Sequence, residues 1–87
     1  MDYIYYDLGF LNTNNSIKVV LDKQANVMLL DDLNYQHYKN GRSYNRYGGL
    51  VKQSPFIVAI PNYAHWYLVI NLGGASGQLK HSVEIIG

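Results

Sequence analysis

The longest regular stretch of the sequence is His65-Trp66-Tyr67-Leu68-Val69-Ile70-Asn71-Leu72, and its alternation decides the fold class. Trp66, Leu68, Ile70 and Leu72 recur at every second position. Successive side chains of a β-strand point to opposite faces, so a period of two residues is typical of a strand with one face buried. We therefore expect a strand here, with the Trp66 side chain in the core and Tyr67, Val69 and Asn71 on the other face.

The same period recurs along the chain. It is present at Ile17, Val19 and Leu21, at Val27 and Leu29, at Phe56, Val58 and Ile60, and at Leu79, Val83 and Ile85, and residues 3–8 are expected to form a first strand. Turn residues at 12–16, 61–62 and 73–77 separate these segments. The pattern predicts an all-β fold, a small antiparallel sandwich or jelly-roll-like barrel of about 6–8 short strands, with at most one helical turn.

Length and composition set the limits of the molecule. The chain has 87 residues, of which 48% are hydrophobic and 15% charged, so residues 1–87 are expected to form a single β domain with its own core. The net charge of +1 excludes a highly charged tail. The sequence contains no cysteine, which excludes disulfides, a thiolate nucleophile and cysteine-ligated metal sites.

Two interpretations compete for residues 31–41. In the first, Asp31 or Asp32 caps a short helix that Gly41 closes, with Tyr35 and Tyr38 on one side. In the second, Asn40-Gly41 forms the turn of a β-hairpin. We favour the helical turn.

One surface stands out by its charge. Residues 1–32 contain five aspartates and two lysines, a net charge of −3, whereas residues 33–83 contain five cations and no acid. The segment from Tyr35 to Gly49 interleaves cations with tyrosines, which can stack on a flat ligand while Arg and Lys bind anions. The candidate ligand-binding residues are Tyr35, Tyr38, Lys39, Arg42, Tyr44, Arg46 and Tyr47. Their expected ligand is anionic or aromatic, such as a nucleotide.

A purely structural role for these tyrosines is an equally simple interpretation. Tyrosines in a long loop of a small β domain can form a lid over the core, with cations stacked on their rings. A weaker candidate surface is the polar face of the last two strands, with Tyr67, Asn71, Lys80 and Ser82.

Catalysis finds little support in the sequence. No serine lies in a nucleophile-elbow context, and the three histidines are not spaced as metal ligands. His65 is expected to be a hydrogen-bonded residue at a strand start, and Asp31-Asp32 to cap a helix. We expect no catalytic residues, no metal, no cofactor and no enzymatic activity in this domain.

No segment has the features of a targeting sequence or a membrane-spanning helix. The N-terminal residues 1–7 are acidic and aromatic, and the longest apolar run, Trp66–Ile70, is far shorter than the ~20 residues needed to cross a bilayer. We expect a cytoplasmic protein that does not contact a membrane.

Several motifs together resemble a known family. They are Tyr6-Asp7-Leu8-Gly9-Phe10-Leu11, Ala25-Asn26-Val27-Met28-Leu29-Leu30-Asp31, Asn34-Tyr35, Tyr38-Lys39-Asn40-Gly41-Arg42, Tyr47-Gly48-Gly49-Leu50, Ser54-Pro55 and His65-Trp66-Tyr67. In this order they resemble the domain-of-unknown-function 1883 family of bacteria. Tyr63-Ala64 stand where that family tends to have Ser-Gly, and Asn71 stands where it tends to have Asp.

The resemblance implies a small β domain that occurs alone or N-terminal to a Toll/interleukin-receptor (TIR) domain, with no assigned activity. We therefore expect a non-catalytic ligand-sensing module that regulates a fused or partner TIR-type effector in bacterial defence. The end of the sequence at Gly87 suits a domain that precedes such an effector. The alternative is a self-assembly or protein-docking module that forms homo-oligomers.

Overall fold

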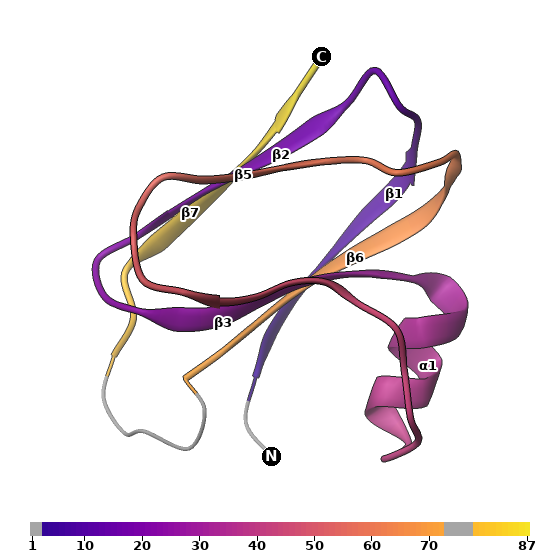
Figure 1. Ribbon diagram of the computed structural model, residues 1–87, viewed down its shortest axis with the longest axis horizontal. Coiled ribbons are helices and arrows are strands. Elements are labelled where there is room, and N and C mark those ends of the chain that lie inside the picture. The colour runs from indigo at the N-terminus through magenta and orange to yellow at the C-terminus, as the bar shows by residue number, and fades with distance from the viewer. Residues whose placement is uncertain (1–2, 73–77) are drawn as a thin grey trace.

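The computed structural model describes residues 3–72 and 78–87, which form seven strands and one helix (Figure 1). In chain order these are β1 (Ile4–Leu11), β2 (Ser16–Leu21), β3 (Ala25–Asp31), α1 (Asp32–Lys39), β4 (Tyr47–Val51), β5 (Phe56–Ala59), β6 (Ala64–Asn71) and β7 (His81–Ile86). The turn predicted at residues 73–77 lies outside the described residues.

The strands form two antiparallel sheets, as predicted. One sheet has the order β1-β6-β3-β4, and the other has the order β5-β2-β7. Consecutive strands β2 and β3 belong to different sheets, so the turn around Lys23-Gln24 carries the chain across the sandwich. The fold is a small β-sandwich, and the predicted fold class is confirmed.

The main core lies between the two sheets, where the alternating residues of the sequence meet. Ile17, Val19, Val27, Leu68 and Ile70 are fully buried in it. Trp66 is also buried, and its indole Nε1–H donates a hydrogen bond of 3.0 Å to the Asn62 carbonyl. The inward face predicted from the period of two is therefore confirmed.

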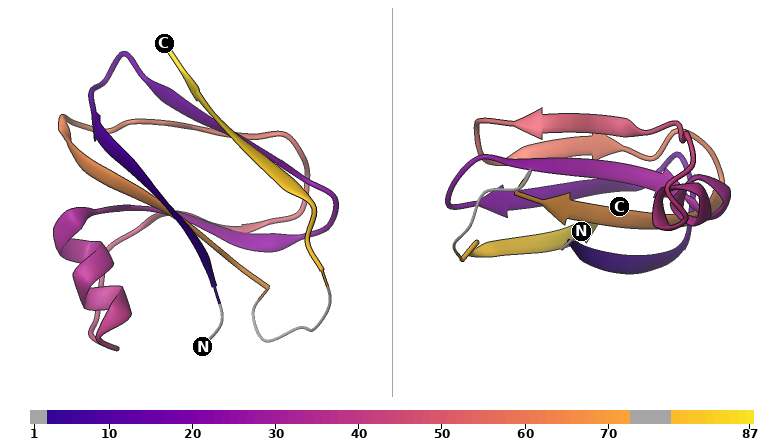
Figure 2. Two further views of the ribbon diagram at one scale, coloured as in Figure 1. Left: turned by 180° about the vertical axis from the view of Figure 1, so that it is seen from behind. Right: turned by 90° about the horizontal axis from the view of Figure 1, so that it is seen from below.

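A second core lies on the outer face of the four-stranded sheet. It contains Met28, Leu30, Tyr35 and Val69, and α1 packs over it against β3 and β6. The helix lies at one end of the strands (Figures 1 and 2). Strand β6 is consequently buried on both faces. The polar surface predicted for the last two strands is wrong, because β6 and β7 belong to different sheets and Tyr67 and Asn71 do not share a face with Lys80 and Ser82.

Helix α1 decides between the two interpretations of residues 31–41. The Asp31 carboxylate caps the helix by accepting a hydrogen bond of 2.9 Å from the Asn34 N–H. Asn40 ends the helix, and Gly41 follows with a φ of +70°. The helix is eight residues long, more than the single predicted turn, and the hairpin alternative is wrong.

Strand β4 is an element that the period of two does not reveal. Residues 47–49 are predicted as part of a loop, but they pair with β3. Gly48 has a φ of +101°, and a Cβ atom there would collide with the Val27 carbonyl oxygen. The glycine therefore allows β4 to lie close to β3, and it supplies no side chain that periodicity could detect.

Candidate functional site

A β-bulge in β1 organises the most exposed aromatic surface of the molecule. The register between β1 and β6 shifts between Asp7 and Gly9, so one extra residue lies on the β1 side. Gly9 has a φ of +75°, and its N–H donates a hydrogen bond of 3.0 Å to Oδ1 of Asp7. After the bulge, Phe10 pairs with His65 on the outer face of the sheet, the same face that carries Asp7 and Tyr67.

Nine aromatic rings form a continuous row on this outer face. In order of contact they are Tyr63, Phe10, His65, Tyr67, Tyr35, Tyr5, Tyr3, Tyr38 and Tyr44, which we call the aromatic row. Successive ring centroids are between 4.2 and 6.2 Å apart. All but the closest of these distances lie within the range for favourable aromatic pairs, and the exception is the stacked pair of Tyr35 and Tyr67. The row is therefore a packed structure rather than a set of isolated side chains.

One half of the row is covered by α1 and the chain that follows it. Tyr35 is only 4% exposed, and its ring stacks on Tyr67 with centroids 4.2 Å apart. The Tyr44 hydroxyl donates to the Met28 sulfur at 3.6 Å. Burial raises the pKa values of Tyr35 and Tyr38 above the ordinary value for tyrosine. Tyr35, Tyr38 and Tyr44 therefore belong to the second core, whereas Tyr5 in the same half is 54% exposed.

The Phe10 and Tyr63 end of the row is open to solvent. Phe10 and Tyr63 are 64% and 68% exposed, and their rings are stacked with an angle of 22° between the planes. We call Asp7, Phe10, Tyr63 and His65 the open patch. Asp7 and Phe10 lie on β1, His65 lies on β6, and Tyr63 directly precedes β6.

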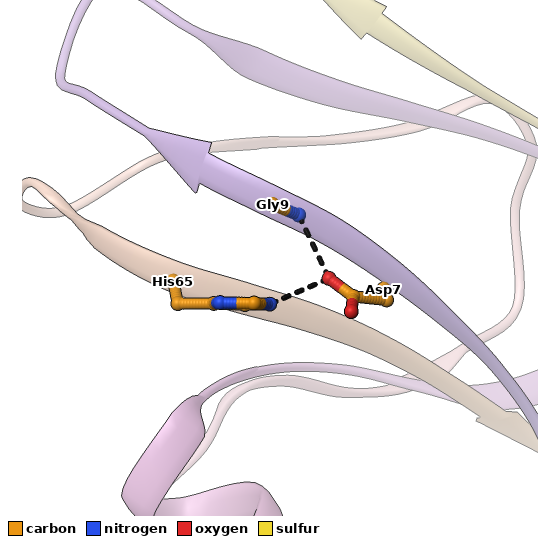
Figure 3. Close-up of polar contacts among 3 residues, drawn as sticks. All are labelled: Asp7, Gly9 and His65. Atoms are coloured by element: carbon orange, nitrogen blue, oxygen red, sulfur yellow. Dashed lines mark hydrogen bonds and ion pairs between the residues drawn. The ribbon is translucent and has the colours of Figure 1, made fainter.

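The polar centre of the open patch is the pair of Asp7 and His65 (Figure 3). Nε2 of His65 lies 2.5 Å from Oδ1 of Asp7, and the imidazole stacks on Tyr67 with an angle of 12° between the planes. The hydrogen bonds from His65 and from the Gly9 N–H hold the pKa of the Asp7 carboxyl below its ordinary value. The other carboxylate oxygen of Asp7 points away from both partners (Figure 3).

The pKa of Tyr67 shows that the charge around its ring is negative. Desolvation raises the pKa of Tyr67, and the negative charges of Asp7 and Asp32 raise it further. Asp7 on β1 and Asp32 at the start of α1 thus both place negative charge near the Tyr67 ring. This agrees with the excess of aspartates in residues 1–32.

The seven residues predicted as a binding site are divided by the structure. Tyr35, Tyr38 and Tyr44 turn inward and belong to the second core, with Lys39 Nζ 5.3 Å from the centre of the Tyr35 ring. Arg42 and Arg46 are exposed, and Arg46 lies along β4 beside Gly49. Tyr47 is separate from this group, because it lies on β4 and its ring contacts Trp66.

The open patch was not among the predicted site residues. His65 is hydrogen-bonded at a strand start, as expected, but its partner Asp7 lies 58 positions earlier in the chain. The local signal that could have indicated the patch is Asp7-Leu8-Gly9-Phe10, in which a side-chain acceptor precedes a glycine by two residues.

Two further properties bear on function. Within residues 3–72 and 78–87, no three or more His, Cys, Asp or Glu side chains are grouped so as to hold a metal ion. In the same part of the chain, no helix has the length and apolar character required to span a membrane.

The family model described as "Domain of unknown function (DUF1883)" matches residues 1–87, and the chain therefore belongs to this family. The expected resemblance is confirmed over the whole sequence. No curated protein and no solved structure matches the chain.

Proposed function

We propose that this member of the DUF1883 family is a non-catalytic binding module whose contact surface is the open patch. The observation that carries the proposal is the exposure of Phe10 and Tyr63, two large stacked rings on and beside the paired strands β1 and β6. Aromatic residues supply a large contact area with few rotamers to order, and contiguous exposed aromatic groups are typical of interaction sites.

The position of Asp7 and His65 supports binding over catalysis. An aspartate that bonds a histidine occurs in hydrolase triads, but there the histidine also contacts a nucleophilic hydroxyl. In the described residues, no serine or threonine hydroxyl bonds to His65. Asp7 and the flat contact with Tyr67 instead fix the orientation of the imidazole within the patch.

The exposed cations at the end of α1 favour a second candidate. The guanidinium groups of Arg42 and Arg46 have no side-chain hydrogen bond or ion pair with any described residue, and Lys39 is exposed beside them in sequence. These three side chains suit an anionic ligand such as a nucleotide phosphate. In this candidate the Tyr35 ring supports Lys39, whose Nζ lies 5.3 Å from the ring centre.

A self-assembly or protein-docking role is supported by a different surface. Val20, Ile57 and Ile86 are exposed on the three-stranded sheet β5-β2-β7, whose edge strands have unpaired backbone groups. This role predicts a mass by light scattering that increases with concentration. It also predicts that Ile57→Lys restores a monomer.

In a cell, we propose that binding is communicated to an attached or partner effector of the TIR type in bacterial defence. The domain itself would act in the cytoplasm and would need no cofactor. The effector would supply any enzymatic activity.

A thermal-shift screen tests whether the open patch is the contact surface. The purified domain is screened against basic, acidic and neutral peptides, nucleotides and simple oligosaccharides. A ligand at a hundred times its dissociation constant adds about 2.7 kcal/mol, and each kcal/mol raises the midpoint of a domain of this size by roughly 4–8 °C. The shift should disappear in Tyr63→Ala and persist in Tyr47→Ala, an exposed tyrosine outside the patch. The opposite result would refute the open patch as the contact surface.

A further inference from the structure

We infer that the open patch binds a cation, and that its ligand is the guanidinium group of an arginine on a partner protein. The inference rests on the proposed function, because it names the chemistry of the group that the patch takes.

The aromatic row already binds one cationic side chain of this protein. Nζ of Lys39 lies 5.3 Å from the centre of the Tyr35 ring, within the range of a cation–π contact. The His65 imidazole contacts the Tyr67 face, the Phe10 ring and the Asp7 carboxylate, so rings and a carboxylate already surround one polar group of this chain. The contact between Lys39 and Tyr35 therefore shows that a ring of the row can bind a cation.

The open patch offers an external ligand two exposed aromatic rings and one carboxylate oxygen. Phe10 and Tyr63 are exposed, and the quadrupole of an aromatic face attracts positive charge. His65 and the Gly9 N–H both contact Oδ1 of Asp7. The second carboxylate oxygen points away from both partners (Figure 3). The Asp7 side chain is 53% exposed, so this oxygen can accept a hydrogen bond from a ligand.

The charge of the surroundings argues against an anionic ligand at this position. Asp7 and Asp32 act on the same tyrosine, Tyr67, and none of the four patch residues is a lysine or arginine. A phosphate or carboxylate would be repelled by these aspartates, whereas a cation would be attracted.

The geometry favours arginine over lysine. A guanidinium is planar, so it can stack on an aromatic ring while its N–H groups donate in the same plane to a carboxylate. The nearly parallel rings of Phe10 and Tyr63 and the adjacent Asp7 carboxylate offer these two kinds of contact. An ammonium is a compact point charge and does not use the flat face in this way.

The test uses two short blocked peptides that differ only in charge at one position, Gly-Arg-Gly and the same peptide with citrulline. Binding to the intact domain is followed by backbone amide shifts in NMR titrations. We expect the arginine peptide to bind at least about tenfold more tightly than the citrulline peptide, and added salt to weaken it. Asp7→Asn should remove most of this preference, and Tyr63→Ala should weaken binding without affecting the fold. Tyr47→Ala should leave binding unchanged.

Other outcomes would overturn the inference in distinct ways. Equal binding of the citrulline peptide would show that charge is not recognised. A neutral sugar or a nucleotide that binds and depends on Tyr63 would refute the arginine ligand and leave the proposed function standing. Self-association that Arg42→Ala abolishes would place the guanidinium in a second copy of this chain, not in a partner protein. No Tyr63-dependent ligand in any class would refute both the inference and the proposed function.

Discussion

The backbone N–H of Gly9 donates a hydrogen bond of 3.0 Å to Oδ1 of Asp7, and the same oxygen contacts Nε2 of His65 (Figure 3). One carboxylate oxygen thus joins the bulge of β1 to β6. The bulge turns Phe10 to the outer face of the sheet, so this contact links the backbone irregularity to the open patch.

Gly9→Ala should destabilise the domain by about 1–2 kcal/mol, the cost of a left-handed conformation for a residue with a Cβ atom. No atom lies within 4 Å of the added carbon, so the cost is conformational and not steric. Gly41→Ala is a matched control, because Gly41 has a similar φ of +70° and equally open surroundings. Urea denaturation should give similar losses for both variants. Only Gly9→Ala should shift the NMR signals of Phe10 and His65, and unchanged signals would contradict the role of the bulge.

The Asp7 carboxyl should titrate below its ordinary value of 3.8, because hydrogen bonds from His65 and Gly9 favour the charged form. A lowered pKa in the folded state stabilises the fold above the unfolded value, and this stabilisation is lost as the pH falls through the folded value. The difference in unfolding free energy between the wild-type protein and Asp7→Asn should therefore shrink as the pH falls from 5 to 2, roughly the interval in which such a carboxyl titrates. A difference independent of pH would contradict the pairing.

Tyr35→Ala should cost about 3–5 kcal/mol, because it removes a buried ring at the centre of the second core. Tyr35→Phe keeps the stacking on Tyr67 and loses only the 3.5 Å contact between the hydroxyls of Tyr35 and Tyr3. It should cost no more than about 1 kcal/mol. Chemical denaturation distinguishes the two variants. A small decrease in the unfolding free energy for Tyr35→Ala would mean that the packing of α1 on the second core contributes little to stability.

Gly48→Ala should be more destabilising than Gly49→Ala by about 2 kcal/mol. Both glycines have positive φ values, but the added Cβ at Gly48 meets the Val27 carbonyl, which is fixed in the sheet. At Gly49 the nearest atoms belong to the Arg46 guanidinium, 3.7 Å away at the end of a flexible side chain. Equal effects on the unfolding free energy would argue against the close approach of β4 to β3.

Much of the fold could be predicted from the sequence because one face of most strands is buried in a single core. The alternation at Ile17, Val19 and Leu21 and at Trp66, Leu68 and Ile70 identified the inward face correctly. Asp31 and Gly41 also marked the ends of the helix. Strand β4 was not predicted, because Gly48 and Gly49 have no side chains that could show a period of two. The outer face of β6 was misjudged because only the tertiary structure shows that α1 covers Val69.

The candidate site was harder to predict than the fold. The tyrosines at 35, 38 and 44 have the composition of a binding surface, but composition does not show whether a ring faces solvent or the sheet. The open patch depends on the pairing of Phe10 with His65, residues far apart in the chain, and on the extra residue of the bulge. A strict period of two would have placed Phe10 in the core.

The most direct test of the account is the map of amide shifts that the arginine peptide causes in the isolated domain. We predict that the shifts centre on Gly9, Phe10 and His65, and that they are small between Arg42 and Tyr47. Shifts confined to residues 42–47 would contradict the account and assign the contact surface to the cationic segment after α1.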